Sequence, residues 1–267
     1  MKIIDGKAIA KEETTAIRTL LTETGMSPRL CIITCAPTLA TESYLALKEK
    51  NATALGIMVA VHRLSAHATT VEAIAAVTEA TSAYEGVIVQ LPLPPNLDTE
   101  AIIGAIPPAK DVDNFRYRGE WQEVLPPVVY AIDAISQREG VSWAGKTVVI
   151  FGAGRLVGQP MAHYAAAKGA RVTVLTEQSD GEEMQKVATA DIVVLGAGKP
   201  RLLTEEMVKN GVVVFDAGAS EDGGLLVGDA DPAVAEKAAL FTPVPGGIGP
   251  ITVAALFHNL LTLARRQ

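Results

Sequence analysis

The stretch "VVIFGAGRLVGQP", Val148 to Pro160, decides the fold of the second half of this chain. A β-rich run at 147–151 leads into Gly152 and Gly154, which is the pattern of a strand that ends in a nucleotide-binding turn. The next glycine is Gly158, one residue later than the common dinucleotide fingerprint places it. The pattern predicts a strand, a tight turn and a helix, and it leaves open which nucleotide, if any, the turn holds.

Short apolar runs alternate with helical periodicity on both sides of this turn. The runs that precede it are "RLCIITCA", "IMVAVHRL" and "GVIVQLP", and those that follow it are "RVTVLT", "DIVVLG", "GVVVFDAG" and "LFTPVP". Near-continuous apolar strands that alternate with helices indicate parallel sheets covered on both faces. We therefore predict an α/β protein of two α/β domains, the second a Rossmann-like parallel sheet, with a cleft between them.

The expected division of the chain follows from these segments. We place the first domain at residues 1–127 and the second at residues 128–250, with a final amphipathic helix at 251–267 that packs back on the first domain. Within the first domain, "TESYLALKEKNATALG" is predicted to be a helix with Thr41 as its N-cap and Gly56 as its stop.

Composition narrows the class of partner. A net charge of −7 argues against nucleic acid, because phosphate binding needs concentrated Lys and Arg. The N-terminus lacks the apolar core of a signal peptide, and no stretch reaches the apolar length of a membrane span, so a cytoplasmic protein is expected. Cys31 and Cys35 have no His or Cys cluster beside them. We expect them to be small core residues in a reducing compartment, and we expect no metal site.

Two segments of the first domain carry candidate chemistry. Tyr44 and Lys48 are four residues apart, so a helix puts both on one face. A lysine made neutral by a dry site can move protons, and a tyrosine beside it can orient a substrate. Gln90 stands at the carboxyl end of a strand, the edge where open α/β sheets bind ligands. The alternatives are a solvated lysine on an ordinary amphipathic helix and a glutamine that caps a strand end.

Two loops add further candidates. "PPAKDVDNF" contains Asp111 and Asp113, which could form a turn, bind a metal or accept hydrogen bonds from an amino-pyrimidinone ring. No His or Glu cluster beside them supports a metal. "TPVPGGIGPITVA" is dense in Gly and Pro and precedes a helix predicted to start near Thr252. Such a loop fixes a backbone that approaches a ligand closely, or it is a structural turn.

Taken together and in this order, these stretches resemble the bifunctional methylenetetrahydrofolate dehydrogenase/methenyltetrahydrofolate cyclohydrolase family over essentially the whole chain. "TPVPGGIGPITVA" is the most specific match, and "GVIVQLPLPPNLD" is a near-verbatim one. The resemblance implies that Lys48 is the catalytic lysine and that Tyr44 orients the folate. It also implies that Gln90 assists Lys48 and that Asp113 binds the pterin ring. Further contacts that we expect are Pro245, Gly246 and Gly247 for the folate, and Gly152, Gly154, Arg155, Gly158, Glu177, Gly196, Gly218 and Thr252 for the cofactor.

The cofactor side departs from the family pattern. The family usually has Gly-Arg-Ser in place of Gly152-Ala153-Gly154, and that Arg and Ser help to hold the 2′-phosphate of NADP. Its His-Ser pair at the end of the next strand is Thr176-Glu177 here. An acid at this position accepts hydrogen bonds from the adenosine ribose and repels a 2′-phosphate. NAD is therefore expected over NADP, unless Arg155 restores phosphate binding or Glu177 is only a solvated loop residue.

The resemblance implies a complete pair of reactions on tetrahydrofolate derivatives. The first oxidises 5,10-methylenetetrahydrofolate to the methenyl form with a nicotinamide cofactor, and the second hydrolyses that product to 10-formyltetrahydrofolate. The family is generally a homodimer formed through the nucleotide domain. Because Asn114 replaces a family glycine and the cofactor side is altered, two alternatives stay open. One is a cyclohydrolase with a decayed nucleotide site, and the other is a non-catalytic folate- or nucleotide-binding protein.

Overall fold

The computed structural model describes residues 1–120 and 124–266 and divides the chain into two compact units, each described here by itself. Unit 1 comprises Met1–Lys11, Tyr117–Gln122 and Pro126–Thr252; unit 2 comprises Glu12–Arg116, Glu123–Leu125 and Val253–Gln267. The prediction placed residues 1–127 together, whereas Met1–Lys11 belong to unit 1. The reason is strand β1 (Lys2–Ile3), which pairs in parallel with β11 (Ala238–Phe241). A strand of two residues is too short to show any periodicity.

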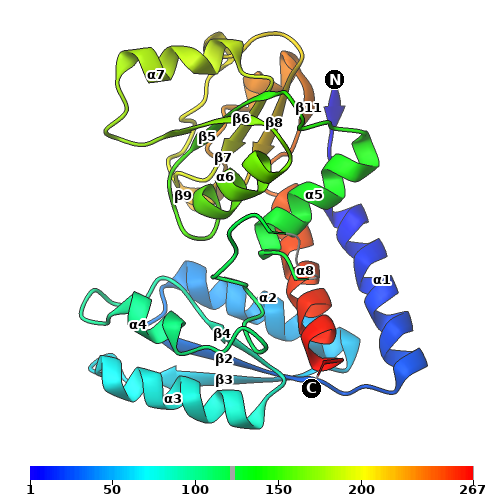
Figure 1. Ribbon diagram of the computed structural model, residues 1–267, viewed down its shortest axis with the longest axis vertical. Coiled ribbons are helices and arrows are strands. Elements are labelled where there is room, and N and C mark those ends of the chain that lie inside the picture. The colour runs from blue at the N-terminus through cyan, green and yellow to red at the C-terminus, as the bar shows by residue number, and fades with distance from the viewer. Residues whose placement is uncertain (121–123, 267) are drawn as a thin grey trace. The chain divides into compact units, whose positions relative to one another are not determined.

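Unit 2 is built on a parallel sheet of three strands in the order β3-β2-β4. These are β2 (Arg29–Cys35), β3 (Met58–Leu64) and β4 (Gly86–Val89). Figure 1 shows helices α2 (Leu39–Leu55) and α3 (Thr70–Ala83) on opposite faces of this sheet. Its remaining helices are α1 (Gly6–Thr24), α4 (Thr99–Gly104) and α8 (Ile248–Ala264), of which α1 and α8 begin in unit 1.

The alternating side chains of β2 form the two cores of unit 2. Leu30 and Ile32 pack in a cluster with apolar residues of α1, α2 and α8. Cys31, Ile33 and Cys35 point to the other face and pack with residues of α3 and α4, as the two-residue period of a strand requires. Both cysteines are free and buried, so they are the small core residues that the sequence predicted.

Helix α2, which carries Tyr44 and Lys48, begins earlier than predicted. Its N-cap is Thr38, whose Oγ1 accepts a hydrogen bond from the backbone N of Thr41 at 3.2 Å. The prediction of Thr41 as N-cap was wrong, because the two residues between the threonines are good helix formers and allow the earlier start. Gly56 ends the helix at φ 71°, in the left-handed conformation that glycine adopts without strain.

Unit 1 contains the predicted Rossmann-like sheet, six parallel strands in the order β1-β11-β8-β7-β5-β6. The strands not yet given are β5 (Thr147–Phe151), β6 (Arg171–Leu175), β7 (Ile192–Leu195) and β8 (Val212–Asp216). Because β6 lies on one side of β5 and β7 on the other, the strand order reverses at β5. Open α/β sheets bind their ligands at the carboxyl end of such a switch point, and the glycine turn lies there.

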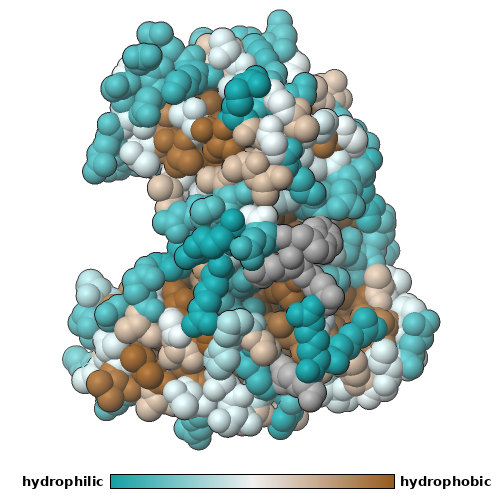
Figure 2. Space-filling view, viewed as in Figure 1, coloured by the Kyte–Doolittle hydropathy of each residue, from teal (hydrophilic) through white to brown (hydrophobic). Residues whose placement is uncertain are grey.

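The other elements of unit 1 are mostly short. The longer helices are α5 (Pro127–Glu139) and α6 (Gly158–Ala167), and α7 (Gly181–Gln185) is short and acidic. Figure 2 shows hydrophilic residues gathered over α7. An antiparallel hairpin joins β9 (Ser220–Asp222) to β10 (Leu225–Val227). Short 3-10 helices span Lys186–Thr189, Glu205–Met207 and Pro232–Glu236. In residues 1–120 and 124–266, no helix has the length and apolarity needed to cross a membrane.

Candidate functional site

Three of the four predicted catalytic residues come together in unit 2. Lys48 projects from α2, and its Nζ donates a hydrogen bond of 2.8 Å to Oε1 of Gln90, directly after β4. The amide of Gln90 is held in this orientation because its Nε2 donates to the carbonyl of Leu91 at 3.0 Å. Its backbone N donates to Ile33 of β2 at 2.8 Å, so the position of Gln90 is fixed by the sheet. Gln90 therefore positions the amine of Lys48.

The third member, Asp113, interacts with Lys48 through charge. Burial lowers the pKa of Lys48 below the usual lysine value, and the negative charge of Asp113 opposes this shift. Burial likewise raises the pKa of Asp113, opposed by the charge of Lys48. A lysine with a lowered pKa can give up and take back a proton near neutral pH, which an ordinary lysine does poorly.

Tyr44 lies one helical turn before Lys48, on the same face of α2, as the spacing predicted. Its side chain is 38% exposed, so it is accessible to a ligand. Partial burial raises its pKa, which keeps the phenol protonated and able to donate a hydrogen bond.

The loop that carries Asp113 is anchored by a residue that the sequence analysis missed. Asn259 of α8 is fully buried, and its Nδ2 donates to the carbonyls of Val112 at 2.9 Å and of Leu125 at 2.7 Å. Asn114, after Asp113, has a φ of 49°, and its Nδ2 donates to Val124 at 2.7 Å. Asparagine tolerates this left-handed conformation better than most residues, which explains how it replaces a glycine. A lone amide in the apolar segment "ITVAALFHNLLTLA" was the available signal for Asn259.

Asp111 is a turn residue. Its Oδ2 accepts a hydrogen bond from the backbone N of Phe115 at 2.8 Å, whereas its buried Oδ1 has no hydrogen-bond partner among the residues that the structure describes. Burial, reinforced by the charge of Asp113, raises its pKa to about 7. Of the alternatives open in the sequence, the geometry supports a turn. In the part of the chain that the structure describes, no three or more His, Cys, Asp or Glu residues group so as to hold a metal ion.

In unit 1, the glycines of the turn after β5 are required by close contacts. Gly152 has a φ of 92°, and a Cβ there would lie 2.7 Å from the carbonyl oxygen of Gly196. A Cβ on Gly158 would run into the carbonyl of Gly152, and one on Gly196 would run into the side chain of Val157. Gly154 differs, since a Cβ there would meet only the Gly196 oxygen at 3.9 Å. This agrees with the interpretation that Gly154 stands in place of a serine.

These contacts describe a backbone that a dinucleotide fits. No Cβ fits at Gly152 or Gly158, so backbone segments pack closely at the end of β5 and the start of α6, as close approach of a pyrophosphate needs. Gly152, Gly158 and Gly196 would hold that part of a dinucleotide, and Arg155 follows in the same turn.

Glu177, after β6, is paired in a way that the sequence did not show. Its Oε1 lies 2.6 Å from Nζ of Lys199, which follows β7. Both side chains are exposed, at 79% for Glu177 and 52% for Lys199. The hydrogen bond from Lys199 lowers the pKa of Glu177, so the carboxylate is charged at neutral pH.

The loop that carries Lys199 rests on a buried carboxylate. Asp229 is fully buried and accepts hydrogen bonds from the backbone N atoms of Ala197, Gly198 and Lys199 at 2.7, 2.9 and 2.8 Å. Gly218 packs against this carboxylate, because a Cβ there would collide with it. Asp229 thereby fixes the backbone at the carboxyl end of β7.

The Gly- and Pro-rich loop lies in unit 1, whereas the Lys48 cluster lies in unit 2. It contains Pro245, Gly246 and Gly247 and receives a hydrogen bond of 2.9 Å from the backbone N of Gly6 to the Gly246 carbonyl. A Cβ on Gly6 would collide with the Gly247 oxygen, so the first turn of α1 is packed on this loop. Helix α8 begins at Ile248, earlier than predicted, and Thr252 lies in its first turns, where its Oγ1 donates to Gly249 at 2.8 Å.

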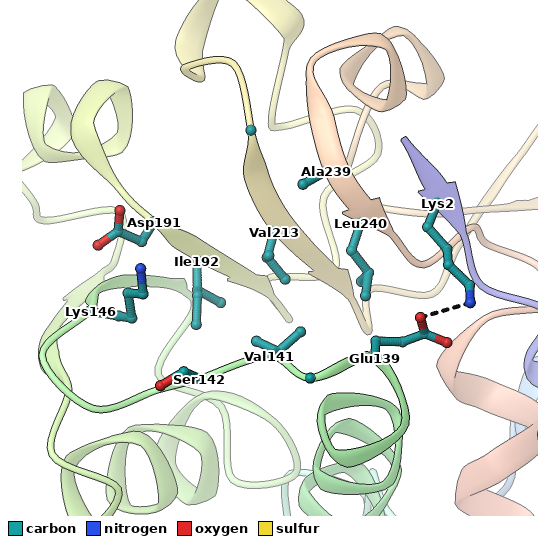
Figure 3. A pocket seen from close by; sticks show the side chains of 12 residues that line it. Lys2, Glu139, Val141, Ser142, Lys146, Asp191, Ile192, Val213, Ala239 and Leu240 are labelled. Atoms are coloured by element: carbon teal, nitrogen blue, oxygen red, sulfur yellow. Dashed lines mark ion pairs between the residues drawn. The ribbon is translucent and has the colours of Figure 1, made fainter.

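A cavity of about 490 Å³ lies at the other edge of the unit 1 sheet. Figure 3 shows Lys2 and Glu139 in an ion pair of 2.8 Å at its rim, and Lys146 and Asp191 at the amino ends of strands. Ligands of such sheets bind at the carboxyl ends, so this cavity is not the predicted dinucleotide site.

Two regions of the chain match the two domains of one protein family. Residues 4–113 match the family model of the tetrahydrofolate dehydrogenase/cyclohydrolase catalytic domain, and residues 126–267 match that of its NAD(P)-binding domain. The bifunctional protein FolD of Campylobacter concisus is 36% identical over 281 residues, covering 100% of this chain and 99% of that protein.

Two solved structures are similar over the same extent. The FolD methylenetetrahydrofolate dehydrogenase/cyclohydrolase of Campylobacter jejuni matches with a TM-score of 0.93 at 31% identity, covering 100% of this chain and 99% of that one. The FolD of Trypanosoma brucei, solved with NADP and an inhibitor, matches with a TM-score of 0.91 at 33% identity, covering 99% and 97%. The resemblance read from the sequence is confirmed, and the chain belongs to the tetrahydrofolate dehydrogenase/cyclohydrolase family, with both its catalytic and its NAD(P)-binding domain.

Proposed function

We propose that this chain oxidises 5,10-methylenetetrahydrofolate with a nicotinamide cofactor and hydrolyses the resulting methenyl form to 10-formyltetrahydrofolate. The observation that carries the proposal is the 2.8 Å hydrogen bond between Lys48 and Gln90, with Asp113 beside them, in the region that matches the family's catalytic domain. A non-catalytic binding protein has little need of a lysine with a lowered pKa.

Hydrolysis needs proton transfer at two points. Water that adds to the methenyl carbon must lose a proton. When the ring opens, the nitrogen that leaves must gain a proton and the new hydroxyl must lose its own to become the formyl oxygen. Lys48 serves both steps because burial lowers its pKa, so its amine gives up a proton more easily than that of an ordinary lysine. Gln90 holds Nζ in place, Tyr44 orients the folate, and Asp113 accepts hydrogen bonds from the amino-pyrimidinone part of the pterin.

Oxidation depends on alignment more than on acid or base. The nicotinamide ring, when bound, takes up a hydride from the one-carbon bridge. In the proposed arrangement, Pro245, Gly246 and Gly247 contact the folate. The residues proposed to hold the dinucleotide are Gly152, Gly154, Arg155, Gly158, Glu177, Gly196, Gly218 and Thr252.

The preferred cofactor in this proposal is NAD. Glu177 is charged and exposed, and it follows β6 at the position from which an acid contacts the adenosine ribose in sheets of this kind. The Arg-Ser pair that holds a 2′-phosphate in the family is absent. A carboxylate accepts hydrogen bonds from ribose hydroxyls and repels a phosphate. We also propose that the protein is a homodimer, as is general in the family, which sedimentation analysis would test.

Two separate assays test the proposal. We expect reduction of NAD by 5,10-methylenetetrahydrofolate, faster than reduction of NADP, and hydrolysis of the methenyl form without any dinucleotide. Hydrolysis with no reduction of either dinucleotide would instead identify a cyclohydrolase with a decayed nucleotide site. Folate binding with neither activity would identify a binding protein, and faster turnover with NADP would contradict the cofactor preference.

A further inference from the structure

The ion pair between Glu177 and Lys199 spans the site at which the strand order of unit 1 reverses. Glu177 follows β6 and Lys199 follows β7, and β5 with its glycine turn lies between these two strands. The pair therefore joins two loops over the carboxyl end of β5, where a dinucleotide is held in sheets of this kind.

The position of Glu177 indicates which part of a dinucleotide would lie near Lys199. In such sheets an acidic residue roughly 20 positions after the glycine turn contacts the 2′-hydroxyl of the adenosine ribose. Glu177 is the residue at this position, and the Lys199 ammonium lies 2.6 Å from its carboxylate. A phosphate on the 2′-oxygen would come within ionic contact of the same ammonium.

The backbone of Lys199 and its charged end are held differently. The backbone of Lys199 is fixed, because its N donates to the buried Asp229 at 2.8 Å together with the two preceding residues. The pair itself is exposed, and exposed ion pairs contribute little and exchange readily. The backbone that carries the ammonium is therefore held in place, while the carboxylate that contacts the ammonium can be replaced by another anion.

We propose that Lys199 is a specificity-determining residue. With Glu177 present, the Lys199 ammonium is paired with that carboxylate; once the carboxylate is removed, the ammonium binds the 2′-phosphate of a dinucleotide. Glu177 then acts in two ways: it repels the phosphate, and it withholds the Lys199 ammonium from it. This inference rests on the proposed NAD preference. A gain of NADP binding then requires no arginine at position 153, because the Lys199 ammonium supplies the cation.

The experiment measures binding of two probes by calorimetry, without folate or turnover. Adenosine 5′-diphosphate reports on the adenosine site, and adenosine 2′,5′-bisphosphate reports on the 2′-phosphate. The variants are Glu177→Ser, Lys199→Met and the double variant. Lys146→Met is the control, because it removes the same charge from the amino ends of the strands, at the opposite edge of the sheet.

We expect Glu177→Ser to bind the bisphosphate about tenfold more tightly or better, as a new charge-assisted contact should. Lys199→Met should weaken bisphosphate binding, the double variant should lose the gain of Glu177→Ser, and Lys146→Met should change neither probe. Retention of the gain in the double variant would overturn the role of Lys199 alone. Failure of the wild type and all variants to bind either probe would overturn the proposed dinucleotide site as well.

Discussion

The Lys48 cluster of unit 2 and the glycine turn of unit 1 are specified in opposite ways. The cluster depends on side chains that come together: Lys48 donates a hydrogen bond to Gln90 and interacts with the charge of Asp113. The turn depends on side chains that are absent, since Cβ atoms at Gly152 or Gly158 would collide with backbone. Residue types reveal the first kind of site and spacing of glycines the second. The proposed cofactor preference adds a third feature, the ion pair between Glu177 and Lys199, which forms only when two loops meet.

The largest difference between the regions should appear on removal of Lys48. Lys48→Met should lower methenyl hydrolysis by ~10²–10⁴-fold, the usual cost of losing a general acid or base, while binding of a dinucleotide stays unchanged. Reduction of NAD should fall less, because hydride transfer needs alignment. Lys50→Met, an exposed lysine on the same helix, is the control. Near-normal hydrolysis in Lys48→Met would show that Lys48 is only a helix residue.

The sequence predicted the residues of the Lys48 cluster, but it did not predict the residues that hold their loops and strands in place. Helical spacing placed Tyr44 and Lys48 on one face, and the strand end placed Gln90, because both follow from local periodicity. Asn259 was missed, since its contacts with Val112 and Leu125 link positions far apart in the chain. The two residues of β1 were missed for the same reason, because only pairing with β11 makes them a strand.

A second test concerns Asp111 and the pH dependence of the free energy of unfolding. The folded-state pKa of Asp111 is about 7, against an ordinary value of 3.8, so the folded protein holds this proton more tightly than the unfolded chain. Its charge therefore costs stability increasingly as pH rises from about 4 through about 7. Asp111→Asn removes that charge, and should be more stable than the wild type above pH 7, by at most about 4 kcal/mol.

The measurement is urea unfolding of both proteins at pH 5 and pH 8. Other titrating groups, such as Asp216, are present in both proteins and cancel in the difference. The gain from Asp111→Asn should be larger at pH 8. An equal gain at both pH values would mean that the unpartnered Oδ1 of Asp111, and not its charge, determines the effect.

Asp113 should act on both reactions, since it is assigned to folate binding. Loss of a charged hydrogen-bond partner costs about 1.5–3 kcal/mol, so Asp113→Asn should weaken folate affinity roughly 10- to 150-fold. The same change removes the charge that raises the pKa of Lys48, and the pH profile of hydrolysis should shift to lower pH. Unchanged affinity with an unchanged profile would leave Asp113 as a turn residue.

The smallest effect on stability is expected at Gly154, and this prediction tests whether the turn depends on absent side chains. Unlike Gly152, Gly154 has no left-handed φ, and a Cβ there meets only one atom, at 3.9 Å. Gly154→Ser should therefore change the free energy of unfolding by no more than about 0.5 kcal/mol. Gly158→Ala is the matched contrast, because its Cβ would run into the carbonyl of Gly152 and force the backbone apart. Overpacking of that kind costs about 1–3 kcal/mol, and dinucleotide binding should weaken with it. Equal stability of the two variants in urea unfolding would show that the turn accommodates side chains without cost. Its glycines would then not be required for a backbone that lets a ligand approach closely.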